Sequence, residues 1–241
     1  MRIGLIADIH GNLLALDTVL AELARVGVDE LICLGDVAAL GPQPGAVIAR
    51  LRALQCPVVM GNTDAWLLDP TLAEGSSAPV LVTSQWCMTQ LSVDDLAYVR
   101  TFSPTLSRTL PDGTELLCFH GSPRSFDDAI TATTPAETLD EMLAGADAAI
   151  MVGGHTHISM MRRHRGARII NTGSVGLPGI GAVTPYNRDV HWAEYAVLDG
   201  DGDHTAITLH RTPLDVAAMV RVAHASDMPE SAWWSSLWRQ Q

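Results

Sequence analysis

The chain opens with Met1-Arg-Ile-Gly-Leu-Ile-Ala-Asp8-Ile-His10-Gly-Asn12, an apolar run that ends in acidic and imidazole side chains. Residues 2–7 lack the alternation of a half-exposed strand and are typical of a buried parallel strand. Leucines recur at helical spacing over residues 13–23, and Asn12 can cap the helix that they predict. The polar segment 8–12 therefore lies at the carboxyl end of the first predicted strand.

The same arrangement repeats twice along the chain. Residues 31–34 predict a second buried strand that leads to Gly35-Asp36, and residues 47–54 predict a helix. Residues 57–60 predict a third strand that leads to Gly61-Asn62. This strand-helix-strand-helix-strand order predicts parallel strands joined by right-handed crossovers.

The remainder alternates helices and strands without a repeat, a low-complexity segment or a linker, which predicts one α/β domain over residues 1–241. A Pro-Asp-Gly turn at 111–113 joins two segments that predict a β-hairpin. The expected helices cover 80–91, 93–101, 135–145 and 213–225, and the expected strands cover 105–110, 114–119, 148–152, 158–163, 168–170, 192–198 and 204–210.

A polar segment follows each of five predicted strands. In open α/β sheets such segments meet in the crevice beyond the carboxyl ends of the strands. If residues i and i+2 of these segments are extended, their side chains point the same way and can hold one ion together. The segments are Asp8-Ile9-His10-Gly11-Asn12, Gly35-Asp36, Gly61-Asn62-Thr63-Asp64, His120-Gly121-Ser122-Pro123-Arg124 and Gly154-His155-Thr156-His157.

Taken singly, most of these segments have a more ordinary explanation, whereas Gly154-His155-Thr156-His157 is moderately specific for a metal site. Asp-x-His is more often a capped loop, and Gly-Asp and Gly-Asn are common turns. His120 alone fits a strand-end histidine whose hydrogen bonds are satisfied. Five such segments in this order, each at a predicted strand end, favour a shared metal site over unrelated turns.

Together with Asn171-Thr172-Gly173-Ser174-Val175-Gly176, these segments resemble the calcineurin-like metallophosphoesterase family. Within it, the chain is similar to small bacterial and archaeal phosphodiesterases that begin with Asp-x-His-Gly-Asn, and the resemblance extends to about Leu209. It implies an α/β fold built as a four-layer α-β-β-α sandwich, with two mixed sheets face to face. It also implies two divalent ions, one on Asp8, His10, Asp36 and His157, the other on Asp36, Asn62, His120 and His155.

The expected ligand chemistry suits phosphoryl transfer. A bridging Asp36 holds two ions about 3.5–4 Å apart, a spacing that clamps an in-line displacement. Because Asn62 is neutral, two dications with Asp8 and Asp36 keep a charge of about +2, which attracts phosphate and acidifies bound water. We expect a metal-bridging hydroxide as nucleophile, and Asp36, Asn62 and His120 as the residues on which catalysis depends. Nitrogen and oxygen ligands favour Mn, Fe, Zn, Ni or Co over Mg.

One position departs from the wider family, in which a histidine that can protonate the leaving group often follows Gly-Asn. Here that residue is Thr63, which cannot act as an acid near neutral pH. Poor leaving groups such as alkyl phosphates are therefore less expected substrates. Asp64 is expected to order its loop, and Asn12 and Arg124 are candidate phosphate contacts. The alternative for Arg124 is a surface ion pair.

Composition narrows the possible partners and the compartment. The net charge of −12 argues against general nucleic-acid binding, although a metal centre can still attract a small anion. The four cysteines form no CxxC pair and are expected to be reduced and structural. The apolar start is too short for a signal peptide, and no run approaches the length of a membrane span, which predicts a cytoplasmic protein without membrane contact.

The tail from about residue 226 to residue 241 carries Trp233, Trp234 and Trp238. Such a cluster can dock on its own domain or form a homo-oligomer contact, because aromatic side chains concentrate at interfaces. The sequence leaves both open.

The leading hypothesis is a binuclear metal-dependent phosphodiesterase acting on a small nucleotide-like substrate. A dinucleoside polyphosphate hydrolase and a protein phosphatase are alternatives within the same fold. A polyphosphate substrate would call for more cationic side chains than Arg124 and the 162–168 segment supply. The alternative from another class is a non-catalytic scaffold.

Overall fold

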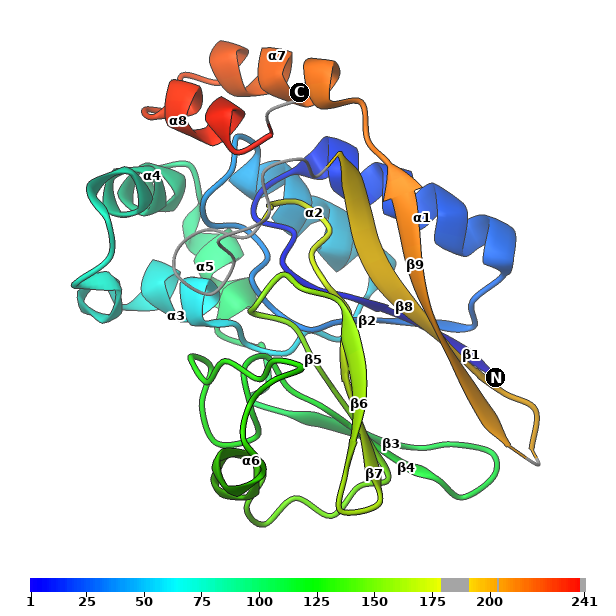
Figure 1. The fold of residues 1–241 in the computed structure, drawn as a ribbon. Coiled ribbons are helices and arrows are strands. Elements are labelled where there is room, and N and C mark those ends of the chain that lie inside the picture. The colour runs from blue at the N-terminus through cyan, green and yellow to red at the C-terminus, as the bar shows by residue number, and fades with distance from the viewer. Residues whose placement is uncertain (179–190, 203, 239–241) are drawn as a thin grey trace.

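Two mixed β-sheets form the centre of the molecule (Figure 1). The computed structural model describes residues 1–178, 191–202 and 204–238, so the last three residues of the tail lie outside the described residues. The first sheet has the order β2-β1-β8-β9, made of Glu30–Cys33, Arg2–Ile6, Trp192–Gly200 and Thr205–Pro213. The second has the order β3-β4-β5-β7-β6, made of Leu106–Thr109, Glu115–Cys118, Ile150–Gly153, Ala167–Asn171 and Met160–His164.

The sheets pack face to face through apolar side chains that their strands supply. Leu5 and Ile32 of the first sheet belong to the same buried cluster as Leu116 and Val152 of the second. Burying these side chains between two sheets is the main favourable contribution to such a layered core.

Helices cover the outer faces unequally (Figure 1). The larger outer layer packs on the first sheet, whereas α6 is the one helix of the described ranges that lies against the second, through Leu139 beside Met151 and Ile169. This confirms the expected four-layer sandwich of two mixed sheets. The helices are α1 Leu13–Val26, α2 Pro44–Leu54, α3 Asn62–Leu68, α4 Ala78–Thr89, α5 Val93–Val99, α6 Ala136–Met142, α7 Val216–Ala225 and α8 Ser231–Ser236, with a 3₁₀ turn at Pro70–Ala73.

The opening of the chain follows the prediction except at the third strand. β1 and β2 are parallel, and Asn12 caps α1 by accepting a hydrogen bond from the amide of Ala15 at 3.2 Å. Residues 57–60 do not form a regular strand. The segment makes one isolated β-bridge on each of its two edges, between Cys33 and Val58 and between Val59 and Ser103. Proline at position 57 has no N–H to donate, and α3 begins at Asn62, so the segment is too short for a ladder.

The C-terminal tail packs on the chain itself. α8 contacts α7, and Trp234 and Trp238 are buried in the cluster that also holds the apolar face of α1. This arrangement matches the first of the two alternatives for the tail. The predicted helix from Pro213 starts later, because β9 runs to Pro213 and Asp215 caps α7.

All four cysteines are free, as predicted, and all four are buried. Within the described ranges, no helix has both the length and the apolar character needed to cross a bilayer.

Candidate metal centre

The predicted ligands meet at the carboxyl ends of the central strands. Asp8 and His10 follow β1, Asp36 follows β2, and Asn62 begins α3. His120 follows β4, and His155 and His157 follow β5. All of them are buried except His155, which is half-buried. The convergence expected from the sequence is therefore present.

The local geometry that points these side chains inward differs from the prediction. Asp8, His10, His155 and His157 have φ values of 57°, 46°, 69° and 57°, so neither Asp-x-His nor His-x-His is extended. Asp36 has the same left-handed conformation, with φ 57°. Non-glycine residues rarely adopt this backbone conformation. Where they do, they are often at functional sites, where the surrounding structure stabilises the strained backbone.

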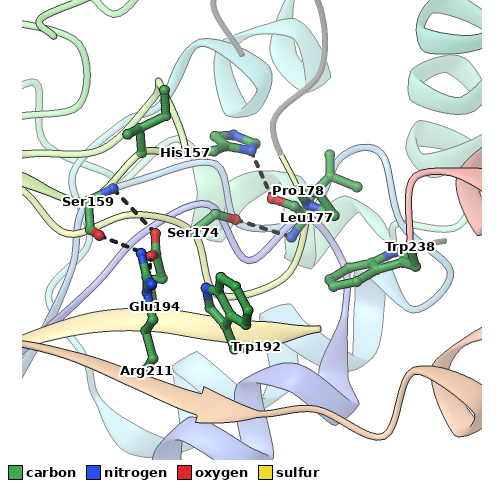
Figure 2. Close-up of a pocket in the computed structure, with 10 residues that line it drawn as sticks. His157, Ser159, Ser174, Leu177, Pro178, Trp192, Glu194, Arg211 and Trp238 are labelled. Atoms are coloured by element: carbon green, nitrogen blue, oxygen red, sulfur yellow. Dashed lines mark hydrogen bonds and ion pairs between the residues drawn. The ribbon is translucent and has the colours of Figure 1, made fainter. Parts of the chain in front are cut away.

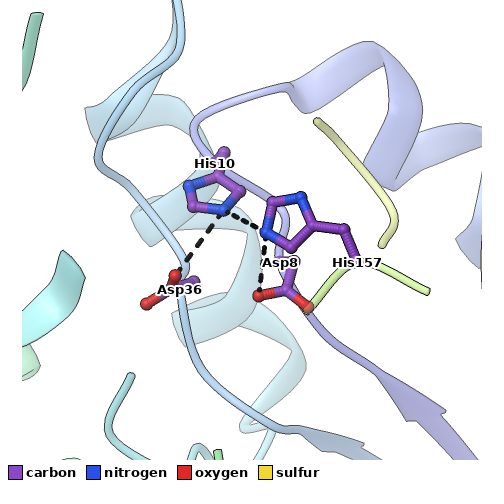
Figure 3. Close-up of side chains that lie close together, drawn as sticks. All are labelled: Asp8, His10, Asp36 and His157. Atoms are coloured by element: carbon purple, nitrogen blue, oxygen red, sulfur yellow. Dashed lines mark hydrogen bonds and ion pairs between the residues drawn. The ribbon is translucent and has the colours of Figure 1, made fainter. Parts of the chain in front are cut away.

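The side chains form two groups that share Asp36. The Asp8 group consists of Asp8, His10, Asp36 and His157, whose ligand atoms lie within 4.8 Å of one another (Figure 3). Asp36, His120 and His155 form a second cluster by the same criterion. Asn62 Oδ1 lies 3.1 Å from His120 Nε2 and 3.0 Å from His155 Nδ1, and we call these four residues the Asn62 group.

Within the Asp8 group, the shortest approach joins two ring nitrogens. His10 Nε2 lies 3.2 Å from His157 Nε2, and His157 Nε2 lies 3.5 Å from Asp8 Oδ1. His10 Nε2 is 3.6 Å from Asp36 Oδ2, and His120 Nε2 is 3.4 Å from the same oxygen. The carboxylate of Asp36 thus faces both groups.

Three imidazoles are oriented from behind by backbone carbonyls. His10 Nδ1 lies 3.1 Å from the carbonyl oxygen of Ala39, His120 Nδ1 2.8 Å from that of Leu34, and His157 Nδ1 2.9 Å from that of Leu177. A proton on each Nδ1 leaves the Nε2 lone pair facing the cluster, the usual support for a metal-bound histidine.

These constraints make the donor set suitable for cations. With Nδ1 protonated, neutral His10 and His157 turn two acceptors toward each other at 3.2 Å. His120 Nε2 likewise faces the acceptor oxygen of Asn62 at 3.1 Å. Acceptors crowded in this way require a proton or a metal ion between them. Nitrogen and oxygen donors at this spacing fit divalent metals.

The protonation states of the protein without metal follow the pairing of the carboxylates. Burial opposes charge on His120, but the Asp36 carboxylate outweighs it and raises the pKa of His120 to about 10. His157 shows the same balance, with its pKa raised by Asp8 against burial. Burial lowers the pKa of His10 to about 4. Hence the metal-free site holds a second proton on the His120 imidazole, which a metal ion would replace, and the raised pKa of His157 favours protonation there too.

Asp64 orders the loops around the shared carboxylate, as the sequence predicted. Its carboxylate accepts hydrogen bonds from the amides of Asp36 and Val37 at 2.8 Å and from that of Gly61 at 3.1 Å. A Cβ on Gly61 would lie 2.1 Å from Asp36 Oδ1, so only glycine permits this approach.

The 171–176 segment also supports the site. The Asn171 amide donates to the carbonyl oxygen of Gly154, and the Ser174 hydroxyl donates to that of Asp8 at 2.9 Å. Both contacts hold the loops that carry the predicted ligands. The carbonyls of Ala39, Leu34 and Leu177 were not foreseen, because a backbone acceptor has no residue-type signal in the sequence.

Asn12, Arg124 and Thr63 lie differently from the predicted ligands. Asn12 is buried, and its amide caps α1 and donates to the carbonyl oxygen of Gly176 at 3.0 Å, a structural role. Arg124 pairs with Asp128 at 2.8 Å and stays 48% exposed. Thr63 is buried, its amide donates to Asp36 Oδ1 at 2.9 Å, and its hydroxyl has no partner among the described residues.

Comparisons with known proteins agree with this geometry. Residues 1–203 match the family model of the calcineurin-like phosphoesterase superfamily domain. The crystal structure of a metallophosphoesterase from Sphaerobacter thermophilus is 24% identical over 99% of both chains, with a TM-score of 0.77. A hypothetical protein from Pyrococcus horikoshii OT3 is 19% identical over 95% of this chain and 94% of its own, with a TM-score of 0.81. An uncharacterized protein of Methanocaldococcus jannaschii is 22% identical over 204 residues, 82% of each chain. The chain therefore belongs to the calcineurin-like phosphoesterase superfamily, a family of metal-dependent phosphoesterase hydrolases.

Proposed function

We propose that this protein is a binuclear metal-dependent phosphodiesterase that acts on a small nucleotide-like substrate. The observation that carries the proposal is the pair of ligand groups that share Asp36. When bound, two such ions would polarise the phosphoryl oxygens and activate a water molecule as the nucleophile. We assign one ion to the Asp8 group and the other to the Asn62 group, with Mn, Fe, Zn, Ni or Co as candidates.

The chain's own residues would position and neutralise the reacting centre. The carbonyls behind His10, His120 and His157 keep their Nε2 lone pairs directed at the site. Asp36 is held by the amide of Thr63 on one oxygen and faces two imidazoles with the other. This preorganisation means that little rearrangement is needed when charge develops on the phosphoryl group.

Three features narrow the class of substrate. Threonine at position 63 supplies no acid for a poor leaving group, whereas a diester with an acidic leaving group needs none. Arg124 offers one partly exposed guanidinium that is already paired with Asp128, which is little for a polyphosphate chain. The acidic net charge of −12 also favours a small substrate over a nucleic-acid polymer.

A substrate panel with the manganese-reconstituted protein tests the proposal. We expect hydrolysis of bis(p-nitrophenyl) phosphate, much slower hydrolysis of p-nitrophenyl phosphate, a diadenosine polyphosphate and a phosphopeptide, and two metal equivalents per chain. His120→Ala should abolish turnover, and His204→Ala, which removes an exposed histidine paired with Asp201, should not. Fewer than two equivalents together with no hydrolysis of any activated ester would support the non-catalytic scaffold instead.

A further inference from the structure

A pocket whose lining includes Trp192 and Trp238 lies beside His157, a member of the Asp8 group (Figure 2). We call it the Trp192 pocket, and its lining includes His157, Ser159, Trp192, Glu194, Arg211 and Trp238. It has a volume of about 70 Å³, several times the roughly 10–15 Å³ that one ordered water requires. It is partly open, so part of a planar organic group can enter it while the rest extends outside.

The pocket and the metal centre share a wall. His157 lines the pocket, while its Nε2 lies 3.5 Å from Asp8 Oδ1 and 3.2 Å from His10 Nε2. Ser174 also lines the pocket, and its hydroxyl donates to the carbonyl oxygen of Asp8 at 2.9 Å. A group in the pocket would therefore lie one imidazole ring away from a phosphoryl group at the Asp8 group.

The polar side chains of the pocket are fixed before any ligand arrives. Glu194 is buried, accepts a hydrogen bond from the Ser159 hydroxyl at 2.9 Å, and accepts another from Arg211 Nε at 2.8 Å. The guanidinium carbon of Arg211 lies 4.7 Å from the ring centroid of Trp192, a cation–π contact. Arg211 thus covers one face of the Trp192 ring, and His191 packs edge-on against the same ring with 4.9 Å between the ring centroids. Because Trp192 still lines the pocket, a ligand ring would stack on the part of it that neither side chain covers.

Trp238 adds an unused donor. Its side chain is 2% exposed, and its indole Nε1 has no hydrogen-bond partner among the described residues. A buried donor without a partner is uncommon and calls for an explanation such as a missing ligand or water. The lining thus includes two indole rings, which suits a planar aromatic group.

We propose that the Trp192 pocket binds the nucleobase of the substrate, stacked on Trp192, while the phosphoryl group lies at the metal centre. This inference rests on the proposed phosphodiesterase function and specifies its substrate as a nucleoside phosphodiester. Stacking of a base on an aromatic side chain is sequence-tolerant, so the pocket selects for the presence of a base more than for its identity.

Two diesters with the same leaving group test the proposal in the manganese-loaded protein. Thymidine 5′-(p-nitrophenyl phosphate) carries a base, and methyl p-nitrophenyl phosphate does not. We expect kcat/KM to be about tenfold or more higher for the thymidine ester. Trp192→Ala and Trp192→Leu should remove that preference and leave the methyl ester unchanged, whereas Trp192→Phe should retain part of it. Trp233→Ala, a partly buried tryptophan outside the pocket lining, serves as the control.

The outcomes separate this inference from the function on which it rests. If both esters are hydrolysed without a preference, or if Trp192→Leu slows both equally, the base site is wrong and the phosphodiesterase stands. If neither ester is hydrolysed, the proposed function fails, and calorimetric titration with thymidine 5′-monophosphate in the absence of metal decides the pocket. Affinity that falls about tenfold in Trp192→Leu supports it, and equal affinity overturns it.

Discussion

The Asp8 group and the Asn62 group share Asp36 but differ in how firmly the protein holds their other members. In the Asp8 group both imidazoles are buried, and each is held by a backbone carbonyl. In the Asn62 group His120 is held in the same way, but His155 is half-buried and faces the centre through Nδ1. Within the described residues, the other ring nitrogen of His155 has no hydrogen-bond partner.

The two groups also differ in charge. The Asp8 group has two carboxylates, whereas the Asn62 group has only the shared carboxylate and a neutral amide. More charge and firmer support should give the Asp8 group the higher metal affinity. Under the proposed function, the more exposed Asn62 group is the side from which the phosphoryl group and its leaving group would reach the centre, while the base would lie in the Trp192 pocket beside the Asp8 group.

Asp36→Asn removes the one residue that both groups use, so it should have the largest effect. Loss of several kcal/mol of transition-state stabilisation corresponds to about 10³-fold or more in kcat/KM for bis(p-nitrophenyl) phosphate. Metal analysis of Asp36→Asn should show that both metal ions bind more weakly than in the wild type. Asp17→Asn, an exposed carboxylate paired with Arg50, is the control. A wild-type rate in Asp36→Asn would show that the shared-carboxylate assignment is wrong.

Thr63→His adds an acid next to Asn62 and tests whether leaving-group protonation limits the reaction. A positioned general acid contributes about 10²–10⁴-fold, so we expect about 10²-fold faster turnover of an alkyl phosphate. A nitrophenyl diester should change little, because its leaving group needs no proton. Thr63→Ser controls for altered packing of this buried side chain, and an equal change for both substrates would contradict the acid role.

His155→Ala and His10→Ala should separate the two ions. Because loss of a supporting contact costs about 10–100-fold in metal affinity, loss of a ligand should cost no less. In calorimetric titrations with manganese, we expect His155→Ala to weaken only the lower-affinity equivalent and His10→Ala to weaken the higher-affinity one. If His155→Ala weakened the higher-affinity equivalent, or if both variants weakened the same equivalent, the proposed difference between the two groups would be wrong.

Metal affinity should rise with pH. His120 has a pKa of about 10 in the metal-free protein and must lose its proton before it can bind an ion. Between pH 6 and 8 the apparent Kd of the Asn62 group should therefore fall by about tenfold for each pH unit. Titrations in buffers with different ionisation enthalpies would count the released proton, and an affinity independent of pH would contradict the imidazolium assignment.

The sequence predicted which residues converge but not how the backbone turns them inward. Apolar runs before Asp8, Asp36 and His120 identify buried strands, and parallel strands bring their carboxyl ends to one edge. The left-handed conformations at Asp8 and His157 lie in loops that contact each other beyond those strands, where the amide of His155 donates to Asp8 Oδ2 at 3.0 Å. Such contacts join residues far apart in the chain, so local pattern cannot reveal them.

Local sequence pattern predicted a third strand that does not form, and it did not predict the Trp192 pocket, because both depend on tertiary contacts. Residues 57–60 have the composition of a strand, yet tertiary context gives them one bridge on each side. Trp192, Arg211 and Trp238 belong to two strands and the tail, and only the fold brings them together beside His157. Sequence spacing carried no sign of this pocket.

Arg124→Ala should have the smallest effect and tests which side the substrate uses. Arg124 pairs with Asp128 at 2.8 Å. Burial raises the pKa of Asp128, but the hydrogen bonds from Arg124 and Ser122, with a smaller effect of His155, lower it overall. If the guanidinium also contacts substrate, its loss removes one charge-assisted hydrogen bond and should raise KM about three- to tenfold with kcat unchanged. Arg165→Ala, which breaks a comparable exposed pair with Asp140, should leave KM as it is. An unchanged KM in Arg124→Ala would assign Arg124 to the ion pair alone and remove this support for approach from the Asn62 group.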